Sequence, residues 1–197
     1  MPPRQDLPVP DPYPGRPVAI KRLVYRESLV LLRLKDAVKT RSGEDANFIL
    51  GADYRVAWTD GKEKDADGND RYHEIIVPRG MLTDLASVPP IFRSLVGRVG
   101  PWLEAAVVHD FLTIAWRVID GDGSARRRRF ADDIMLAAMR EAKVGELRKW
   151  SIYAGIRALA LVAYPQKAKP APWSNYAADL GEEYILQQLA KDVHLPQ

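Results

Sequence analysis

The sequence contains no cysteine, which excludes a disulfide framework, a thiolate metal site and a cysteine nucleophile. Histidine is scarce, with only His73, His109 and His194, and so few imidazoles do not favour a histidine-rich zinc site. No apolar run reaches the ~18 residues needed to span a bilayer. The first residues also lack the basic-then-apolar pattern of a signal peptide. We therefore expect a soluble chain without a transmembrane segment that is made in the cytoplasm.

The net charge is small and the apolar content is ordinary. A formal charge of +3 does not by itself indicate nucleic acid, because dedicated binders concentrate much more positive charge on one face. Apolar residues make up 47% of the chain, which is typical of a globular protein. The length of 197 residues suffices for one domain with a sizeable core and appended arms.

The first half of the chain predicts an arm followed by strands. Residues 1–17 contain seven prolines, and proline fixes φ and lacks an N–H group, so we expect an extended arm there. Residues 18–35 predict two strands. Residues 54–58 and 72–77 are rich in β-branched and aromatic side chains and predict a hairpin pair joined by a polar loop, residues 59–71.

The second half predicts helices, because the pattern changes after Pro78. Glycines at 121, 123 and 145 separate the main helical segments, and Ser124 is suited to cap one of them. The expected helices cover residues 92–96, 101–116, 124–142, 146–163 and 174–192.

These elements predict an α+β fold, with a small antiparallel sheet followed by a three-helix bundle. We expect a single domain over residues 18–165. Residues 1–17 then form an extended N-terminal arm, and residues 166–197 form a linker and a C-terminal docking helix. The terminal segments offer little to their own core, so docking on other proteins is their expected use.

The helix after Pro101 is apolar nearly all round, which predicts that it is buried. His109 and Asp110 lie in its middle. A buried carboxylate without a partner is strongly unfavourable. Asp110 should therefore contact an arginine, a metal ion or several backbone donors.

Asp132 lies on the apolar face of the next helix and could meet His109 if the two helices form an antiparallel hairpin. A carboxylate on one ring nitrogen of a histidine fixes its tautomer and leaves the other nitrogen as a base. Ser87 lies in the segment that joins the sheet to the helices, where functional residues often concentrate. His109, Asp132 and Ser87 are therefore the candidate catalytic residues.

A metal site is a second hypothesis for the same region. Asp84 precedes Ser87 in the joining segment. If Asp84 and Asp110 converge, their oxygen ligands favour a hard cation, calcium or magnesium, over zinc. The alternative to both kinds of site is a buried polar network that only holds the helices together.

Three ordered sequence blocks resemble domain-of-unknown-function family 1353, whose members are small proteins found in tailed-phage and prophage genomes. The first block is Gly80–Pro89, with the sequence GMLTDLASVP. The second is Ala105–Thr113, AAVVHDFLT, and the third is Arg128–Asp132, RRFAD. The resemblance covers roughly residues 18–165, and it implies a phage protein made in the cytoplasm of a bacterial host.

The chain departs from the family pattern at two places, since Met81 replaces a phenylalanine and Thr113 replaces a tyrosine. The arrangement also resembles secreted phospholipases A2. In those enzymes a histidine activates water, the adjacent aspartate helps to bind calcium and a second aspartate orients the histidine. The corresponding residues here are His109, Asp110 and Asp132, although the cysteines and the glycine-rich calcium loop of those enzymes are missing.

Three weaker patterns have plainer explanations. Residues 65–70 (DADGND) resemble a calcium loop, but their turn-forming composition favours a polar hairpin tip. Residues 126–129 are four arginines at the start of a helix, where they oppose the helix dipole and need carboxylate partners such as Asp132 and Asp133. One helical face is expected to lie in the core and carries Trp150, Ala154, Arg157 and Leu161.

Our functional hypothesis is a virion-associated protein of the tail or neck region of a tailed phage, with a hydrolase-like site of the His-Asp kind. It would contact other virion proteins through the N-terminal arm and the C-terminal helix. Two alternatives stay open. One is a phage hydrolase of cell-envelope peptide, glycan or lipid that is not built into the particle. The other, which the small net charge disfavours, is a nucleic-acid-binding protein.

Overall fold

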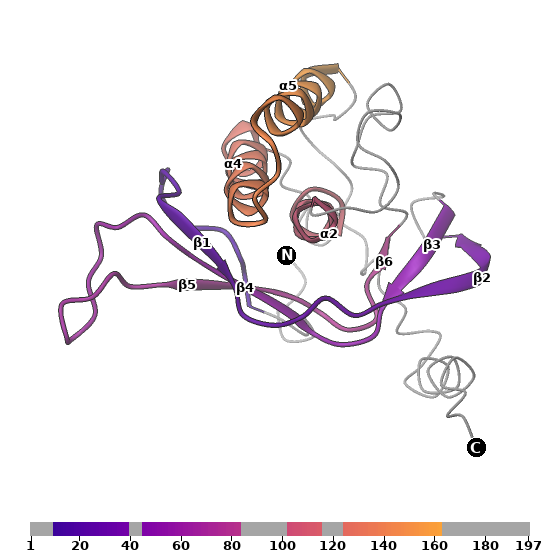
Figure 1. Ribbon diagram of the computed structural model, residues 1–197, viewed down its shortest axis with the longest axis horizontal. Helices are drawn as coiled ribbons and strands as arrows, with labels where there is room; N and C mark the ends of the chain where they lie inside the picture. The colour runs from indigo at the N-terminus through magenta and orange to yellow at the C-terminus, as the bar shows by residue number, and fades with distance from the viewer. Residues whose placement is uncertain (1–9, 40–44, 84–101, 116–123, 163–197) are drawn as a thin grey trace.

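The computed structural model describes residues 10–39, 45–83, 102–115 and 124–162, and it confirms the α+β class (Figure 1). Six strands precede three helical segments in the described part of the chain. The strands form two three-stranded sheets rather than the single sheet expected from the sequence. In Figure 1, α2 lies near the centre, with α4 and α5 above β1 and with β2, β3 and β6 on the other side.

The first sheet is antiparallel, and its order is β1-β4-β5. These strands are β1 (Arg22–Tyr25), β4 (Tyr54–Thr59) and β5 (His73–Val77). The central strand, β4, buries both of its faces, which explains its run of aromatic and β-branched side chains. The β4–β5 hairpin is the one that the sequence predicts, and its register pairs Tyr54 with Val77.

The tip of this hairpin is a polar turn. One carboxylate oxygen of Asp65 accepts hydrogen bonds from the backbone N–H groups of Asp67 (3.0 Å) and Asn69 (2.8 Å). Asp70 pairs with Lys64 (2.6 Å) and Lys21 (3.1 Å). These bonds confirm the hairpin-tip interpretation of residues 65–70, because the carboxylates of Asp65 and Asp70 are engaged in local turn and ion-pair contacts.

The second sheet contains two strands that the sequence analysis does not predict, residues 45–50 and 82–83. It consists of β2 (Leu31–Lys39), β3 (Asp45–Leu50) and β6 (Leu82–Thr83), in the order β2-β3-β6. Only the second half of β3 is a continuous apolar run, which is too short to predict a strand from the sequence. The segment is a strand because it pairs with β2. Gly80 turns the chain from β5 into β6 at φ 84°, and its N–H donates to the carbonyl of Leu50 at 2.8 Å.

The helices follow the predicted order. They are α2 (Leu103–Asp110), the π-helical continuation η2 (Phe111–Ala115), α4 (Ala125–Glu141) and α5 (Glu146–Val162). α4 is the shared neighbour of α2, α5 and β1. None of the described helices is long and apolar enough to cross a membrane. The expected helices at 92–96 and 174–192 lie outside the described residues.

The described part of the N-terminal segment packs on its own domain. The hydroxyl of Tyr13 donates to the carbonyl of Leu112 in η2 at 2.5 Å. Its ring lies 5.6 Å from that of Phe130 and under the guanidinium of Arg127, 4.6 Å from the centroid. Arg126 donates to the carbonyl of Gly15 at 2.8 Å. Residues 10–17 therefore lie against α4 and η2.

Substitution of Tyr13 tests whether this segment contributes to folding. We expect Tyr13→Phe to lower the free energy of unfolding by about 1 kcal/mol, the usual value of one net hydrogen bond. Tyr13→Ala also loses the ring contacts and should cost about 2–3 kcal/mol, which is low for an aromatic truncation because the ring is only half-buried. Leu147→Ala is the control, since Leu147 is 85% exposed. Urea unfolding measures all three, and equal midpoints would show that residues 10–17 do not stabilise the domain.

Candidate functional site

The carboxylate of Asp132 lies at the centre of a buried polar cluster. The side chain belongs to α4 and is 2% exposed. One oxygen, Oδ1, lies 3.0 Å from Nε2 of His109 on α2, so the expected contact between these two residues is present. The other oxygen, Oδ2, accepts a hydrogen bond from Nη1 of Arg157 on α5 at 3.0 Å. The cluster therefore joins three helices through a single carboxylate.

Arg157 is the residue of this cluster that the sequence reading placed wrongly. It was expected to lie in the core with Trp150 and Ala154, but Trp150 is 47% exposed and Ala154 is exposed too. The Arg157 side chain instead reaches from α5 to Asp132 with 37% of its surface exposed. A usable signal did exist, because a buried Asp132 needs a cation and Arg157 is one of the basic residues on the following helix.

His109 has one ring nitrogen occupied and one without a partner among the described residues. Nε2 faces Asp132, whereas Nδ1 is buried and makes no hydrogen bond there. If Nε2 carries the proton and donates it to Asp132, Nδ1 keeps its lone pair and is the basic nitrogen. The residue is 4% exposed. The arrangement is that of a histidine oriented by a carboxylate.

Asp110, next in the chain, is held separately. Its Oδ2 accepts a hydrogen bond from the hydroxyl of Thr83 at 2.7 Å, and both residues are buried. Thr83 ends β6, so this bond ties the second sheet to α2. The sequence reading expected an arginine, a metal or backbone donors at Asp110 and did not single out Thr83, although Thr83 lies within the first of the three sequence blocks.

The helix geometry changes immediately after Asp110. Residues 111–115 form a π-helix, a conformation that occurs mostly as single turns within α-helices and frequently at functional sites. The hydroxyl of Thr113 donates to the backbone carbonyl of His109 at 2.7 Å, so it bonds to the helix and not to a carboxylate. Periodicity in the sequence gave no sign of the π-helix.

The proposed metal ligands are only partly placed. Asp84 lies outside the described residues, so its convergence with Asp110 stays a prediction. The catalytic candidate Ser87 lies outside them too. Within the described ranges there is no group of three or more histidine and acidic side chains that could hold a metal ion. Among the described residues, the candidate catalytic site is therefore the His109–Asp132–Arg157 cluster.

A second group of titratable residues lies at the start of α2. Burial raises the pKa of Glu104 in the first turn of that helix. Burial, followed by the charge of Glu104, raises the pKa values of Tyr25 and Tyr54 on the first sheet. The hydroxyl of Tyr25 donates to the carbonyl of Ala138 at 2.7 Å. These residues link the sheet to the helices, and the sequence reading did not identify them as a group.

The arginine run at the start of α4 has mixed partners. Arg129 pairs with Asp133 at 3.2 Å, as expected, but Asp132 binds Arg157 instead of the run. Arg127 lies 3.7 Å from Asp11 in the N-terminal segment.

Comparison with protein families gives a match to part of the chain. Residues 62–156 match the model of a family described as protein of unknown function, DUF1353. Over this segment the chain is similar to the DUF1353 family. The matched part contains Thr83, His109, Asp110 and Asp132 and ends one residue before Arg157. Neither the curated proteins nor the solved structures give a match.

The DUF1353 segment thus holds both the imidazole and the carboxylate of the cluster. It begins in the β4–β5 hairpin and runs through α4 into α5. The N-terminal segment and the strands β1, β2, β3 and β4 lie before it. Because β1 packs on α4, residues outside the family match also help to position Asp132.

Neutralising Asp132 tests whether its charge holds the cluster together. We expect Asp132→Asn to lower the free energy of unfolding by about 2 kcal/mol, because it weakens the hydrogen bonds of a charged carboxylate with His109 and Arg157. Asp133→Asn is the matched control one position along the same helix. It breaks a more exposed ion pair, so it should cost about 1 kcal/mol or less. Chemical denaturation measures both, and equal losses would contradict a central role for Asp132.

The raised pKa of Glu104 predicts a pH-dependent stability difference. A carboxyl whose pKa is higher in the folded state favours folding at low pH, where it is protonated, and opposes folding once it ionises. Glu104→Gln should therefore raise the Tm at pH ~7, where an unperturbed glutamate is ionised. The gain should shrink as the pH falls toward the ordinary glutamate value of 4.5. Glu74→Gln, at an exposed position of β5, is the control. A pH-independent difference would show that the charge of Glu104 is not responsible.

Proposed function

We propose that this DUF1353 domain is hydrolase-like and uses His109 as a general base. The observation that carries the proposal is the asymmetry of the imidazole. Nε2 lies 3.0 Å from a buried carboxylate, while Nδ1 has no partner among the described residues. A histidine that is oriented at one nitrogen and basic at the other is the usual form of a catalytic base.

The chemistry follows from the contacts. Nδ1 of His109 removes a proton from a water molecule while the water oxygen attacks the scissile carbon of the substrate. The imidazolium that forms is stabilised by Asp132, and it returns the proton to the leaving group as the bond breaks. Arg157 holds the other oxygen of Asp132, which keeps the carboxylate in position for His109. Arg157 acts through Asp132 and is a positioning residue.

The substrate class that we propose is a peptide, glycan or lipid bond of the bacterial cell envelope. This part of the proposal rests on the resemblance to a phage family and on the likeness of the His-Asp pair to that of secreted phospholipases A2. A calcium or magnesium ion held by Asp84 and Asp110 belongs to the same hypothesis. Thr83 already occupies one oxygen of Asp110.

We further propose that the protein is associated with the virion of a tailed phage, in the tail or neck region. The terminal segments are the candidate docking elements. Residues 10–17 already contact their own domain, so the docking segments in this proposal are residues 1–9 and 166–197. A phage hydrolase outside the particle is the alternative, and mass spectrometry of purified particles distinguishes the two by the presence or absence of the chain.

The rival explanation is a structural network without catalysis, and the low exposure of His109 favours it. A base must be reachable, so modification by diethyl pyrocarbonate is informative. Under native conditions His109 should react more slowly than the half-exposed His73 but to completion. If His109 reacts only after unfolding, the buried-network explanation is supported and the general base is rejected.

Activity provides the direct test. The probes are a nitrophenyl ester, purified peptidoglycan and phospholipid vesicles, each assayed with and without calcium. We expect His109→Gln to lower the rate at least ~100-fold, since general-base catalysis commonly contributes that much or more. His73→Gln is the control and should leave the rate unchanged, because His73 stacks on Trp58 and pairs with Glu63 rather than with the cluster. Equal rates in the parent and His109→Gln would contradict the proposal.

A further inference from the structure

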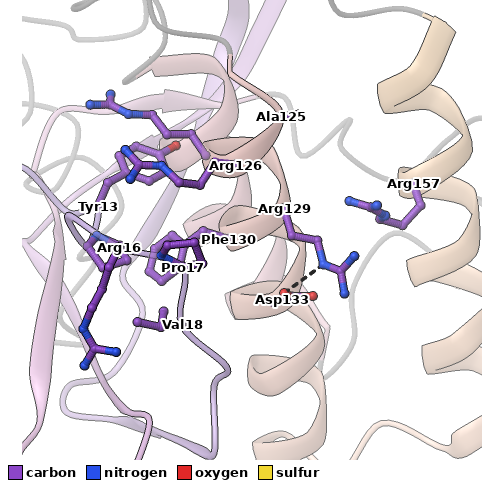
Figure 2. A pocket seen from close by; sticks show the side chains of 12 residues that line it. Tyr13, Arg16, Pro17, Val18, Ala125, Arg126, Arg129, Phe130, Asp133 and Arg157 are labelled. Atoms are coloured by element: carbon purple, nitrogen blue, oxygen red, sulfur yellow. Dashed lines mark hydrogen bonds and ion pairs between the residues drawn. The ribbon is translucent and has the colours of Figure 1, made fainter. Parts of the chain in front are cut away.

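A groove of about 410 Å³ lies between the N-terminal segment, the beginning of α4 and one residue of α5 (Figure 2). Five of its twelve lining residues are arginines, and the single acidic one is Asp133. The arginines come from all three segments and are Arg16, Arg126, Arg127, Arg129 and Arg157. A volume of this size is typical of a site for a small organic ligand.

The arginines keep donors available for a ligand. A guanidinium has five N–H groups, and the bonds made here use only some of them. Arg126 donates to the carbonyl of Gly15 and has no carboxylate partner among the described residues. Arg129 bonds to Asp133 through Nε, and Arg157 bonds to Asp132 through Nη1. In Figure 2, Arg129 and Arg157 extend into the space between α4 and α5.

The beginning of α4 also needs negative charge. Its first turn carries successive arginines and no acidic residue. The N-terminal end of a helix has a positive partial charge, so these arginines oppose the helix dipole. An anion bound in the groove would offset both the dipole and the mutual repulsion of the guanidinium groups.

The apolar part of the groove restricts the ligand class further. Tyr13, Pro17, Val18 and Phe130 line it beside the arginines. The guanidinium of Arg127 lies over the ring of Tyr13. The groove therefore has apolar and aromatic side chains next to cationic ones. A ligand that fits such a surface combines an anionic group with an apolar or ring-shaped part.

We propose that this groove binds the phosphate of a small organic phosphate, such as a nucleotide. Arginine forks match phosphate oxygens in geometry, and several converging arginines suit a phosphate dianion better than a single carboxylate. The inference does not depend on the hydrolytic role of His109. It concerns a different surface, which shares only Arg157 with the buried cluster.

Calorimetric titration of the full chain with inorganic pyrophosphate and with ADP tests the proposal. We expect dissociation constants of roughly 10–100 µM, within the range of a few charge-assisted bonds. The affinity should fall with salt, because the groove is partly open to solvent. Arg126→Ala should weaken binding about fivefold, and Arg126→Glu should weaken it further. Arg126 is the residue of choice because it is exposed and has no bond to Asp132 or His109.

Arg148→Ala is the matched control, since Arg148 is an exposed arginine of α5 that does not line the groove. It should bind as the parent does, and thermal melts should show that all the variants are folded. Arg129→Ala is a second variant that should also weaken the binding of both probes. The proposal is overturned if neither probe binds at about 10 mM, a concentration that detects even weak sites. Equal affinity of the parent and of Arg126→Glu for these probes overturns the proposal as well. So does a chain that binds a single-stranded oligonucleotide but neither pyrophosphate nor ADP.

Discussion

The carboxylate of Asp132 is the constraint on which the helical half of this protein depends. A charged group that is 2% exposed must have partners for both of its oxygens, because burying an unpaired ion is strongly unfavourable. The partners come from different helices, His109 from α2 and Arg157 from α5. α2 and α5 both pack on α4 and are thus held in register with it by two contacts of 3.0 Å, the usual length of such hydrogen bonds.

Further polar ties connect this helical half to the sheets. Thr83 at the end of β6 donates to Asp110, and Tyr25 of β1 donates to a carbonyl of α4. Each tie provides a hydrogen-bond partner for polar groups that folding removes from water. His109 therefore lies on rigid elements that are fixed from both sides. That placement suits a catalytic group, which must be held precisely, and it suits a structural network equally well.

Much of the fold could be predicted from the sequence, and the failures have physical causes. The β4–β5 hairpin and the helices α4 and α5 follow from strong local patterns and clear stop signals. β3 has a continuous apolar run of only three residues and becomes a strand through its pairing with β2. Whether the strands form one sheet or two depends on which strands pair. Local sequence patterns do not show this, because paired strands can be far apart in the chain. The α+β class was therefore predictable, whereas the second sheet was not.

The candidate site divides in the same way. The sequence by itself determined that His109 and Asp132 face the interior, since each is a polar residue on an apolar helical face, and it determined that a buried Asp132 needs partners. Only the tertiary structure decided which cation supplies the second bond. Arg157 has a long side chain whose reach depends on how α5 packs against α4, and no periodicity along one helix contains that information. The arginine-lined groove also depends on the tertiary structure, because three segments that are distant in sequence meet to form it.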